Sequence, residues 1–168
     1  MTNLFAFRVP LILFAAIGSA LSAGIFYAFS TFVMRALAQQ PVASGIATMQ
    51  TINITVINPW FMAAFFGPAI ACVPLIVVAL RHWHTPGAPY WLLGSLLYLL
   101  GTIGVTIAAN VPLNDALAAV LPDSSEGTEL WGQYLTDWTV WNHVRTLAAL
   151  LAAVFFSLSL CLRTGPVA

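Results

Sequence analysis

The sequence predicts an all-α fold: an integral membrane four-helix bundle with short helices in its outer loops. The first observation is composition, because 61% of the 168 residues are hydrophobic, only 6% are charged and the mean hydropathy is +0.94. About a quarter of the residues of an ordinary soluble domain are charged. The second observation is that four apolar stretches each reach the roughly 20 residues that a helix needs to cross a bilayer core.

These stretches predict four spans within a single transmembrane domain, residues 1–168. They cover about residues 9–37, 60–80, 90–110 and 139–162. The first begins like a secretory signal, with Arg8 before an apolar run and small residues in "SALSAG". The run continues through "IFYAFSTFVM", however, and is longer than the apolar region of a signal peptide. We therefore expect a retained membrane helix.

Charge placement predicts the orientation of the spans. Arg8, Arg81 and Arg163 fall on one side of the bundle. All five acidic residues fall on the other, in one interval: Asp115, Asp123, Glu126, Glu129 and Asp137. Because arginine-bearing loops stay in the cytoplasm, we expect a multi-pass protein of the cell membrane with both termini cytoplasmic. The sequence has no lysine and no basic cluster, which excludes a nucleic-acid interface.

Two outer connections are predicted to contain helices. In "SGIATMQTINITVINPWF" apolar residues recur at helical spacing around Asn53, which predicts a short helix lying on the bundle. Asn58 then caps the second span, with Pro59 in its first turn. The segment "NVPLNDALAAVLPDSSEGTELWGQYLTDW" predicts a short helix, a proline break and a new helix capped by Asp123 with Glu126. This new helix could run unbroken into the fourth span.

The fourth span carries a polar cluster at its outer end. Steps of three and four residues place Trp131, Tyr134, Trp138, Trp141 and Arg145 on one stripe, with Asn142 beside it. We expect Arg145 to make cation–π contacts with Trp138 and Trp141. An arginine within a membrane span is energetically unfavourable enough to suggest a functional site.

The partners expected for Arg145 are Asp137, Asp115 or an anionic ligand. His143 lies about 160° from Arg145 around the helix and points to different neighbours. The alternative interpretation is structural: aromatic residues at helix ends form interfacial belts, and a lone histidine is often packed and hydrogen-bonded.

The third span supplies a matching seam of polar residues at steps of four: Thr102, Thr106, Asn110 and Asn114. Such spacing places them along one side of a helix, rising to the outer surface. Polar groups of different spans are thus predicted to converge in the outer third of the bundle. Two histidines alternate in the inner turn without a cysteine or carboxylate beside them, so the sequence predicts neither a metal site nor a cofactor.

Four blocks resemble the anthrone-oxygenase-like membrane family: "GIFYAFSTFVMRALAQQP", "GIATMQTINITVINPWFM", "GTIGVTIAANVPLNDALAAV" and "LWGQYLTDWTVWNHVRTLAALLA". The resemblance runs from about Gly24 to Leu151, and "NVPLN" and "WNHVRT" are its most specific parts. It implies a four-span bundle that oxidises anthrones to anthraquinones without an evident cofactor. The matching positions are Asn53, Asn58, Pro59, Asn110, Pro112, Asn114, Asp115, Trp138, Trp141, Asn142, His143 and Arg145.

An anthrone is flat, apolar and acidic at the carbon between its outer rings, so its oxidation needs an aromatic slot, a base and donors for the developing anion. The expected slot contains Phe26, Phe65, Trp138 and Trp141. The catalytic residues are expected to be His143, Arg145 and Asp137, with Asp115 as another base. Substrate binding is expected from Asn53, Asn58, Asn110, Asn114, Trp138, Trp141 and Asn142.

The expected partners are membrane lipids, an apolar aromatic small molecule and dioxygen. Two other functions fit the same residues. One is a protein that binds or transports a lipid or amphiphile through the outer pocket without chemistry. The other is a structural membrane protein whose polar cluster only fixes the fold.

Overall fold

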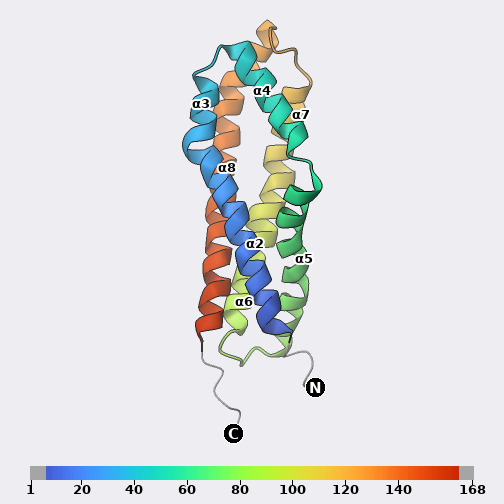
Figure 1. The fold of residues 1–168 in the computed structure, drawn as a ribbon, viewed down its shortest axis with the longest axis vertical. Helices are drawn as coiled ribbons and strands as arrows, with labels where there is room; N and C mark the ends of the chain where they lie inside the picture. Colours follow the sequence, from blue (N-terminus) through green and yellow to red (C-terminus); the bar gives the residue numbers. More distant parts are fainter. Residues whose placement is uncertain (1–6, 163–168) are drawn as a thin grey trace.

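The computed structural model describes residues 7–162, and over that range the chain is an elongated bundle of helices without strands (Figure 1). Four helices are long and apolar enough to cross a membrane: Arg8–Ala38, Pro59–Arg81, Ala88–Ala118 and Ser125–Cys161. The prediction of an all-α fold with four membrane helices is confirmed. Arg163, which contributed to the predicted orientation, lies outside the described residues.

Two of the long helices change their winding along their length. The first comprises α2 (Arg8–Ala28), a π-helical turn η1 (Phe29–Val33) and α3 (Met34–Ala38). The third comprises α6 (Ala88–Leu96), the π-helical segments η2 (Leu97–Gly104) and η3 (Thr106–Asn110), and α7 (Val111–Ala118). The second and fourth, α5 (Pro59–Arg81) and α8 (Ser125–Cys161), are α-helical throughout. π-helical turns are uncommon and are found often at functional sites.

The first outer connection forms the expected helix, α4 (Val42–Thr55). Ile46 and Met49 on α4 are fully buried, so this helix lies on the bundle as predicted. Asn58 caps α5 by accepting hydrogen bonds from the amides of Trp60 at 3.1 Å and Phe61 at 3.0 Å. This cap was also predicted.

The second outer connection differs from the prediction. The expected short helix is α7, which continues the third long helix instead of standing apart. The helix after the proline break does run unbroken as α8, but its cap is Ser124 rather than Asp123. The Ser124 hydroxyl accepts a hydrogen bond from the Gly127 amide at 2.9 Å. The predicted pairing of Asp123 with Glu126 is one residue out of register, because Asp123 precedes the residue with the extended backbone of a cap.

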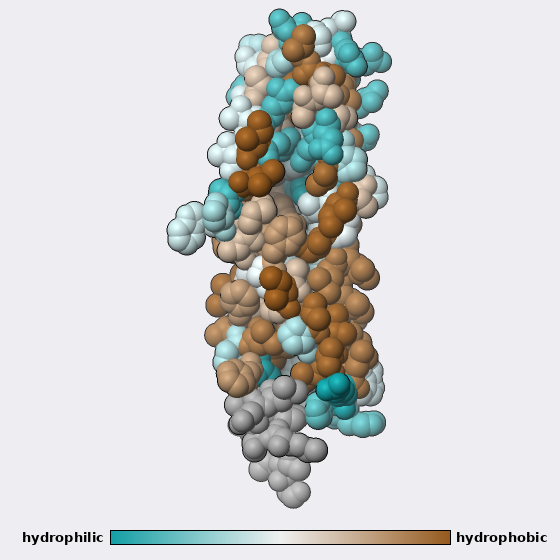
Figure 2. All heavy atoms as spheres, turned by 90° about the vertical axis from the view of Figure 1, so that its right-hand side faces the viewer, coloured by the Kyte–Doolittle hydropathy of each residue, from teal (hydrophilic) through white to brown (hydrophobic). Residues whose placement is uncertain are grey.

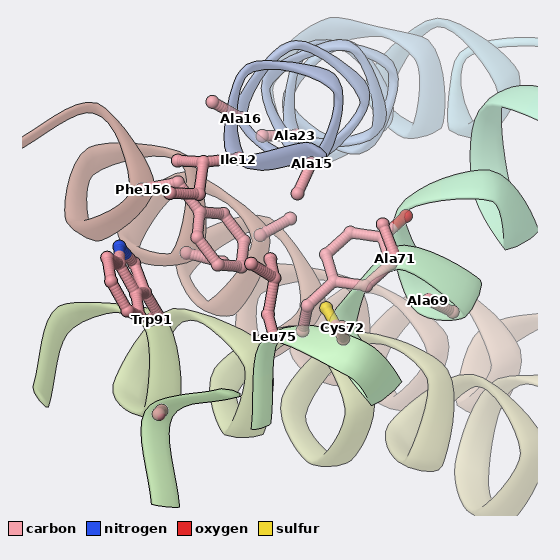
Figure 3. Packing of buried hydrophobic residues seen from close by; sticks show 14 of the residues in the cluster. Ile12, Ala15, Ala16, Ala23, Ala69, Ala71, Cys72, Leu75, Trp91 and Phe156 are labelled. Atoms are coloured by element: carbon pink, nitrogen blue, oxygen red, sulfur yellow. The ribbon is translucent and has the colours of Figure 1, made fainter. Parts of the chain in front are cut away.

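Each long helix packs against two neighbours: α2 and α6 both contact α5 and α8. The buried side chains form two separate clusters. The cluster near the chain termini contains small residues, together with Ile12, Leu75, Trp91 and Phe156 (Figure 3). The other lies near α4, where Ile46 and Met49 pack with aromatic side chains of α8. By position along the helices, a gap remains between the two clusters.

Helix length locates this gap relative to a membrane. The described ends at Arg8, Arg81, Ala88 and Cys161 meet at one end of the bundle, opposite α4 (Figure 1). Roughly 20 residues of helix cross the hydrocarbon core. Counted from that end, the far boundary falls near four residues: Ala28, Phe61, Ala108 and Trp141. Figure 2 shows the same change on one face, where apolar residues prevail toward the termini and hydrophilic ones gather toward α4.

Candidate functional site

A cavity of about 290 Å³ lies at this boundary, between the two buried clusters. Segments from all four long helices and α4 line it. Most of its wall is apolar, including Phe26, Met49, Phe61, Phe65 and Trp138. Its polar lining consists of Asn53, Thr106, Asn114 and Arg145. A small apolar pocket with a few converging polar groups is the usual form of a small-molecule site.

Arg145 is the only charged residue among those that line the cavity in the described part of the chain. Its side chain is 6% exposed. The guanidinium donates from Nη2 to the Asn142 amide oxygen at 2.7 Å and from Nη1 to the Thr106 hydroxyl at 3.2 Å. Its central carbon lies 4.4 Å from the Phe26 ring centroid and 5.1 Å from that of Trp138. The expected cation–π contact with Trp138 is therefore present. The second such contact is with Phe26 and not, as expected, with Trp141.

No carboxylate balances this charge. All five acidic residues of the chain are exposed, including Asp115 and Asp137, the two expected partners of Arg145. The groups that hold the guanidinium are neutral, and its Nε–H has no hydrogen-bond partner. A buried charge without a counter-ion is strongly unfavourable. The arrangement therefore suits an anion that arrives from outside the protein.

Asn142 holds Arg145 in place. Its side chain is fully buried and donates to the Phe26 carbonyl and to the Ser30 hydroxyl, each at 2.8 Å, while its oxygen accepts from Arg145. Phe26 lies three residues before the π-helical turn η1 and Ser30 lies within it, so Asn142 ties α8 to the first helix at its change of winding. Asn142 does not line the cavity and acts through Arg145.

The α4 side of the cavity contains a hydrogen-bonded aromatic wall. The Asn114 side-chain oxygen accepts from the Tyr134 hydroxyl and from the Trp138 indole nitrogen, both at 2.8 Å. Asn110, fully buried behind this wall, donates to the Trp138 carbonyl at 3.2 Å. These bonds fix the ring of Trp138, which lines the cavity, and that of Tyr134 beside it. Asn53 on α4 completes the lining, and its Nδ2 is buried without a hydrogen-bond partner.

A second polar contact holds the backbone of Phe65, whose side chain lines the cavity. The Tyr98 hydroxyl donates to the Phe65 carbonyl at 2.8 Å and lies 3.0 Å from the Ser22 hydroxyl. Phe65 lies in the turn before Pro68, where the proline removes a backbone donor from α5. The Tyr98 hydrogen bond thus ties the third helix to the turn of α5 that precedes Pro68.

The polar seam of the third helix stays on one side because the helix winding varies. In an α-helix of 3.6 residues per turn, a step of four overshoots a full turn. In a π-helix, where hydrogen bonds join residues five apart, a step of four falls short of one. Thr102 and Thr106 lie in π-helical segments, and Asn114 lies in α7. The two deviations offset each other, so Thr106 and Asn114 both reach the cavity.

Four of the predicted site residues line the cavity together: Asn53, Asn114, Trp138 and Arg145. Asn110 and Asn142 are buried behind them. The predicted slot residues Phe26 and Phe65 also line the cavity.

The other predicted site residues lie elsewhere. Trp141 is 43% exposed, and His143 and Asp137 are also exposed. The buried face of α8 passes through Trp138, Asn142 and Arg145, so Trp141, which the wheel placed on the stripe of Arg145, lies outside that face. Asn58 caps α5 and does not line the cavity. None of these four contributes to the cavity wall, and a catalytic role for His143 or Asp137 stays a prediction.

Some cavity residues were not predicted. Phe29, Phe61 and Met62 lie in apolar segments that look like ordinary membrane helix. The sequence contained only an indirect indication, namely a short helix around Asn53 that was expected to lie on the bundle. This helix, α4, supplies Met49, Ile52 and Asn53 to the cavity wall. Among residues 7–162 no three His, Cys, Asp or Glu side chains gather as a metal site would require.

A family model described as anthrone oxygenase matches residues 60–155, more than half of the chain. The chain belongs to the anthrone oxygenase family. In this family member the matched range contains Arg145, its support Asn142, and the wall formed by Asn114 and Trp138, whereas Asn53 and Phe26 come before it. No curated protein and no solved structure matches the chain.

Proposed function

We propose that this protein is an oxidoreductase that oxidises an apolar polycyclic phenol or anthrone with dioxygen, without a cofactor, in the cavity. It acts in the cell membrane as a multi-pass protein with both termini cytoplasmic. The observation that carries the proposal is Arg145: a buried cation without a carboxylate partner, on the wall of an aromatic cavity. Family membership supports the same reaction class.

The reaction needs an anion and a site that stabilises it. Loss of a proton from the carbon between the outer rings of an anthrone places negative charge on the oxygen opposite that carbon. Donors fixed where charge develops lower the barrier most, because they need no reorganisation during the reaction. The guanidinium of Arg145 is held by Asn142 and Thr106 and meets this requirement.

The electron-rich carbon then reacts with dioxygen. The carbanion gives electrons to dioxygen, a carbon–oxygen bond forms, and protonation yields a hydroperoxide. Loss of the remaining hydrogen of that carbon as a proton, with cleavage of the oxygen–oxygen bond, releases water and leaves a carbonyl. The sum is one anthrone and one dioxygen converted to one anthraquinone and one water, so dioxygen is the only oxidant required.

The position of the cavity supports an apolar substrate. It lies where the helices reach the bilayer boundary, and several lining residues, including Phe66 and Ile107, are also exposed on the outside of the bundle. A substrate dissolved in lipid and dioxygen, which favours lipid over water, would both be concentrated there. Lipids and a flat aromatic molecule are accordingly the proposed partners.

A second function has its own supporting observation. No histidine or carboxylate lines the cavity in the described part of the chain, which is what a protein that only binds an apolar anion would show. Such a protein would carry or sequester the amphiphile without oxidising it.

Oxygen uptake separates the two functions. The protein, purified into lipid nanodiscs, is mixed with anthrone while dioxygen consumption and anthraquinone absorbance are followed together. We expect uptake well above that of empty nanodiscs, with one dioxygen consumed per anthraquinone formed, and loss of the excess in Arg145→Gln. Arg35→Gln, which changes an exposed arginine of α3, is the matched control and should keep the activity. Tight binding without uptake would favour the binding function.

A further inference from the structure

We propose that the cavity binds its substrate as a preformed oxyanion that also carries a second oxygen acceptor, and that no side chain of the protein acts as the base. This inference rests on the proposed function and specifies its substrate and its proton transfer. It starts from two features of the cavity. Some hydrogen-bond donors in its wall have no partner, and no histidine or carboxylate that could act as a base lines it in the described part of the chain.

The polar lining has a surplus of donors. Arg145 Nε and Asn53 Nδ2 are both buried without a hydrogen bond; the Asn53 amide lies beside the Tyr134 hydroxyl, whose own hydrogen bond goes to Asn114. Two of the side-chain acceptors in the polar lining are already occupied: the Asn114 oxygen takes two hydrogen bonds, and the Thr106 hydroxyl accepts from Arg145 while donating to the Thr102 carbonyl at 2.7 Å. The Asn53 amide oxygen is the remaining one, so donors still outnumber acceptors. Unsatisfied buried donors are unfavourable, so a ligand that fits must bring acceptors.

Charge specifies one of these acceptors. One ionised ligand oxygen would balance the single positive charge of the guanidinium. Charge-assisted hydrogen bonds are about twice as strong as neutral ones. Asn53 lies on α4 and Arg145 on α8, so two separate elements present the free donors. The inferred substrate is a planar monoanion with one ionised oxygen at Arg145 and a second, neutral oxygen at Asn53.

The base predicted from the sequence is missing from the cavity. His82 and His84 lie in the turn between α5 and α6, at the end of the bundle away from α4, and His143 is exposed. The five carboxylates are exposed as well. From the elements packed around Arg145, the groups that face it are Phe26 of the first helix, Thr106 of the third, and Asn142 and Trp138 of α8. Within residues 7–162, Tyr134 of α8 is the titratable group that acts electrostatically on Arg145.

Water then takes the proton. The substrate loses it to water or buffer at the membrane surface, which the cavity adjoins, and the anion enters with its electron pair intact. Arg145 stabilises the bound anion and therefore lowers the pKa of the bound substrate below that of the free molecule. The step needs no protein base, and the subsequent consumption of dioxygen is unchanged.

The test uses a ligand that ionises visibly but does not react with dioxygen. 2-Hydroxyanthraquinone has the size of three fused rings, several oxygen acceptors, and different absorbance as phenol and phenolate. It is titrated by pH in nanodiscs containing wild type, Arg145→Gln, Asn53→Leu or His143→Gln. We expect its apparent pKa to fall by at least about one unit in wild type, and we expect Arg145→Gln to abolish that shift. His143→Gln should leave the shift unchanged.

The Asn53 variant tests the second acceptor. Loss of one hydrogen bond should weaken binding of 2-hydroxyanthraquinone about three- to tenfold in Asn53→Leu. Binding of anthracene, which has the same rings and no oxygen, should not weaken. If Arg145→Gln does not assemble, Arg145→Lys keeps the charge without the guanidinium and should retain part of the shift.

Several results would overturn the inference: an unshifted pKa in wild type, a shift that survives Arg145→Gln, or a shift lost in His143→Gln. The proposed function can fail separately. A shifted pKa without anthrone-dependent oxygen uptake leaves the oxyanion site standing and removes the oxygenase. Oxygen uptake that requires Arg145, together with an unshifted pKa of the ligand, would support the oxygenase and rule out the oxyanion site.

Discussion

At the scale of single residues, Arg145 and His143 show what helix periodicity can and cannot predict. The helical wheel separated them, and the structure buries Arg145 while leaving His143 exposed. The wheel could not show which face met the cavity, because that depends on how α8 is rotated against three other helices. It also could not show that Asn142, rather than a carboxylate, would hold the guanidinium.

Replacing Arg145 should slow oxidation rather than merely weaken binding. Removing one preorganised donor from an oxyanion site lowers kcat by about 10²- to 10³-fold. We expect a loss of that size in Arg145→Gln, a smaller one in Arg145→Lys, and a change of KM of less than about tenfold, since the apolar wall is intact. Steady-state oxygen uptake measures both constants. A large rise in KM at constant kcat would instead show that Arg145 stabilises the bound substrate and the transition state equally.

Replacing Asn142 should affect both stability and activity. Asn142→Leu removes its bonds to the Phe26 carbonyl, the Ser30 hydroxyl and Arg145, and it leaves these groups buried. We expect the free energy of unfolding to fall by roughly 2 kcal/mol, measured by denaturation in detergent micelles, with activity reduced as Arg145 loses its position. Gln133→Leu, an exposed amide on the same helix, should change stability by less than about 0.5 kcal/mol.

At the scale of helices, the apolar stretches predicted the existence of all four spans, because length and composition alone decide whether a helix can cross a bilayer. Boundaries were less predictable. The third helix was expected to end at residue 110 and continues through α7 to Ala118, with Pro112 inside the long helix, directly after the π-helical segment η3. The π-helical segments η1, η2 and η3 were not predicted from the sequence.

Close packing of the third helix on α8 makes a further prediction. A Cβ added at Gly101 would lie 2.5 Å from the Ala148 Cβ, so Gly101→Ala should push the helices apart. Overpacking of this kind costs about 1–3 kcal/mol, and the double variant Gly101→Ala with Ala148→Gly should recover most of it. Gly132→Ala on α8 has open space and should stabilise the fold by about 0.5–1 kcal/mol. Thermal unfolding of the four proteins in one detergent provides the comparison, and a Gly101→Ala variant as stable as wild type would contradict the packing.

At the scale of the whole molecule, the bundle is longer than a membrane is thick. The 37 residues of α8 extend about 55 Å at 1.5 Å per residue, against a hydrocarbon core of about 30 Å. The half that carries α4 therefore projects beyond the core. Trp60, 87% exposed, lies where the helices reach the boundary, as interfacial aromatic residues do. The sequence predicted polar groups in the outer third, but a cavity between two buried clusters could only be found from the packed structure.

The proposed orientation in the cell can be tested with single cysteines. In a background with Cys72→Ala and Cys161→Ala, a cysteine is introduced either at Gln40, exposed in the turn before α4, or at His84, exposed in the turn between α5 and α6. The excess of arginine at the end with the termini predicts that this end is cytoplasmic. A membrane-impermeant maleimide should therefore label Gln40→Cys in intact cells, and it should label His84→Cys only after the membrane is opened. The reverse pattern would place the cavity on the cytoplasmic side, so that the water next to its mouth, and the pH at which a substrate anion forms, would be those of the cytoplasm.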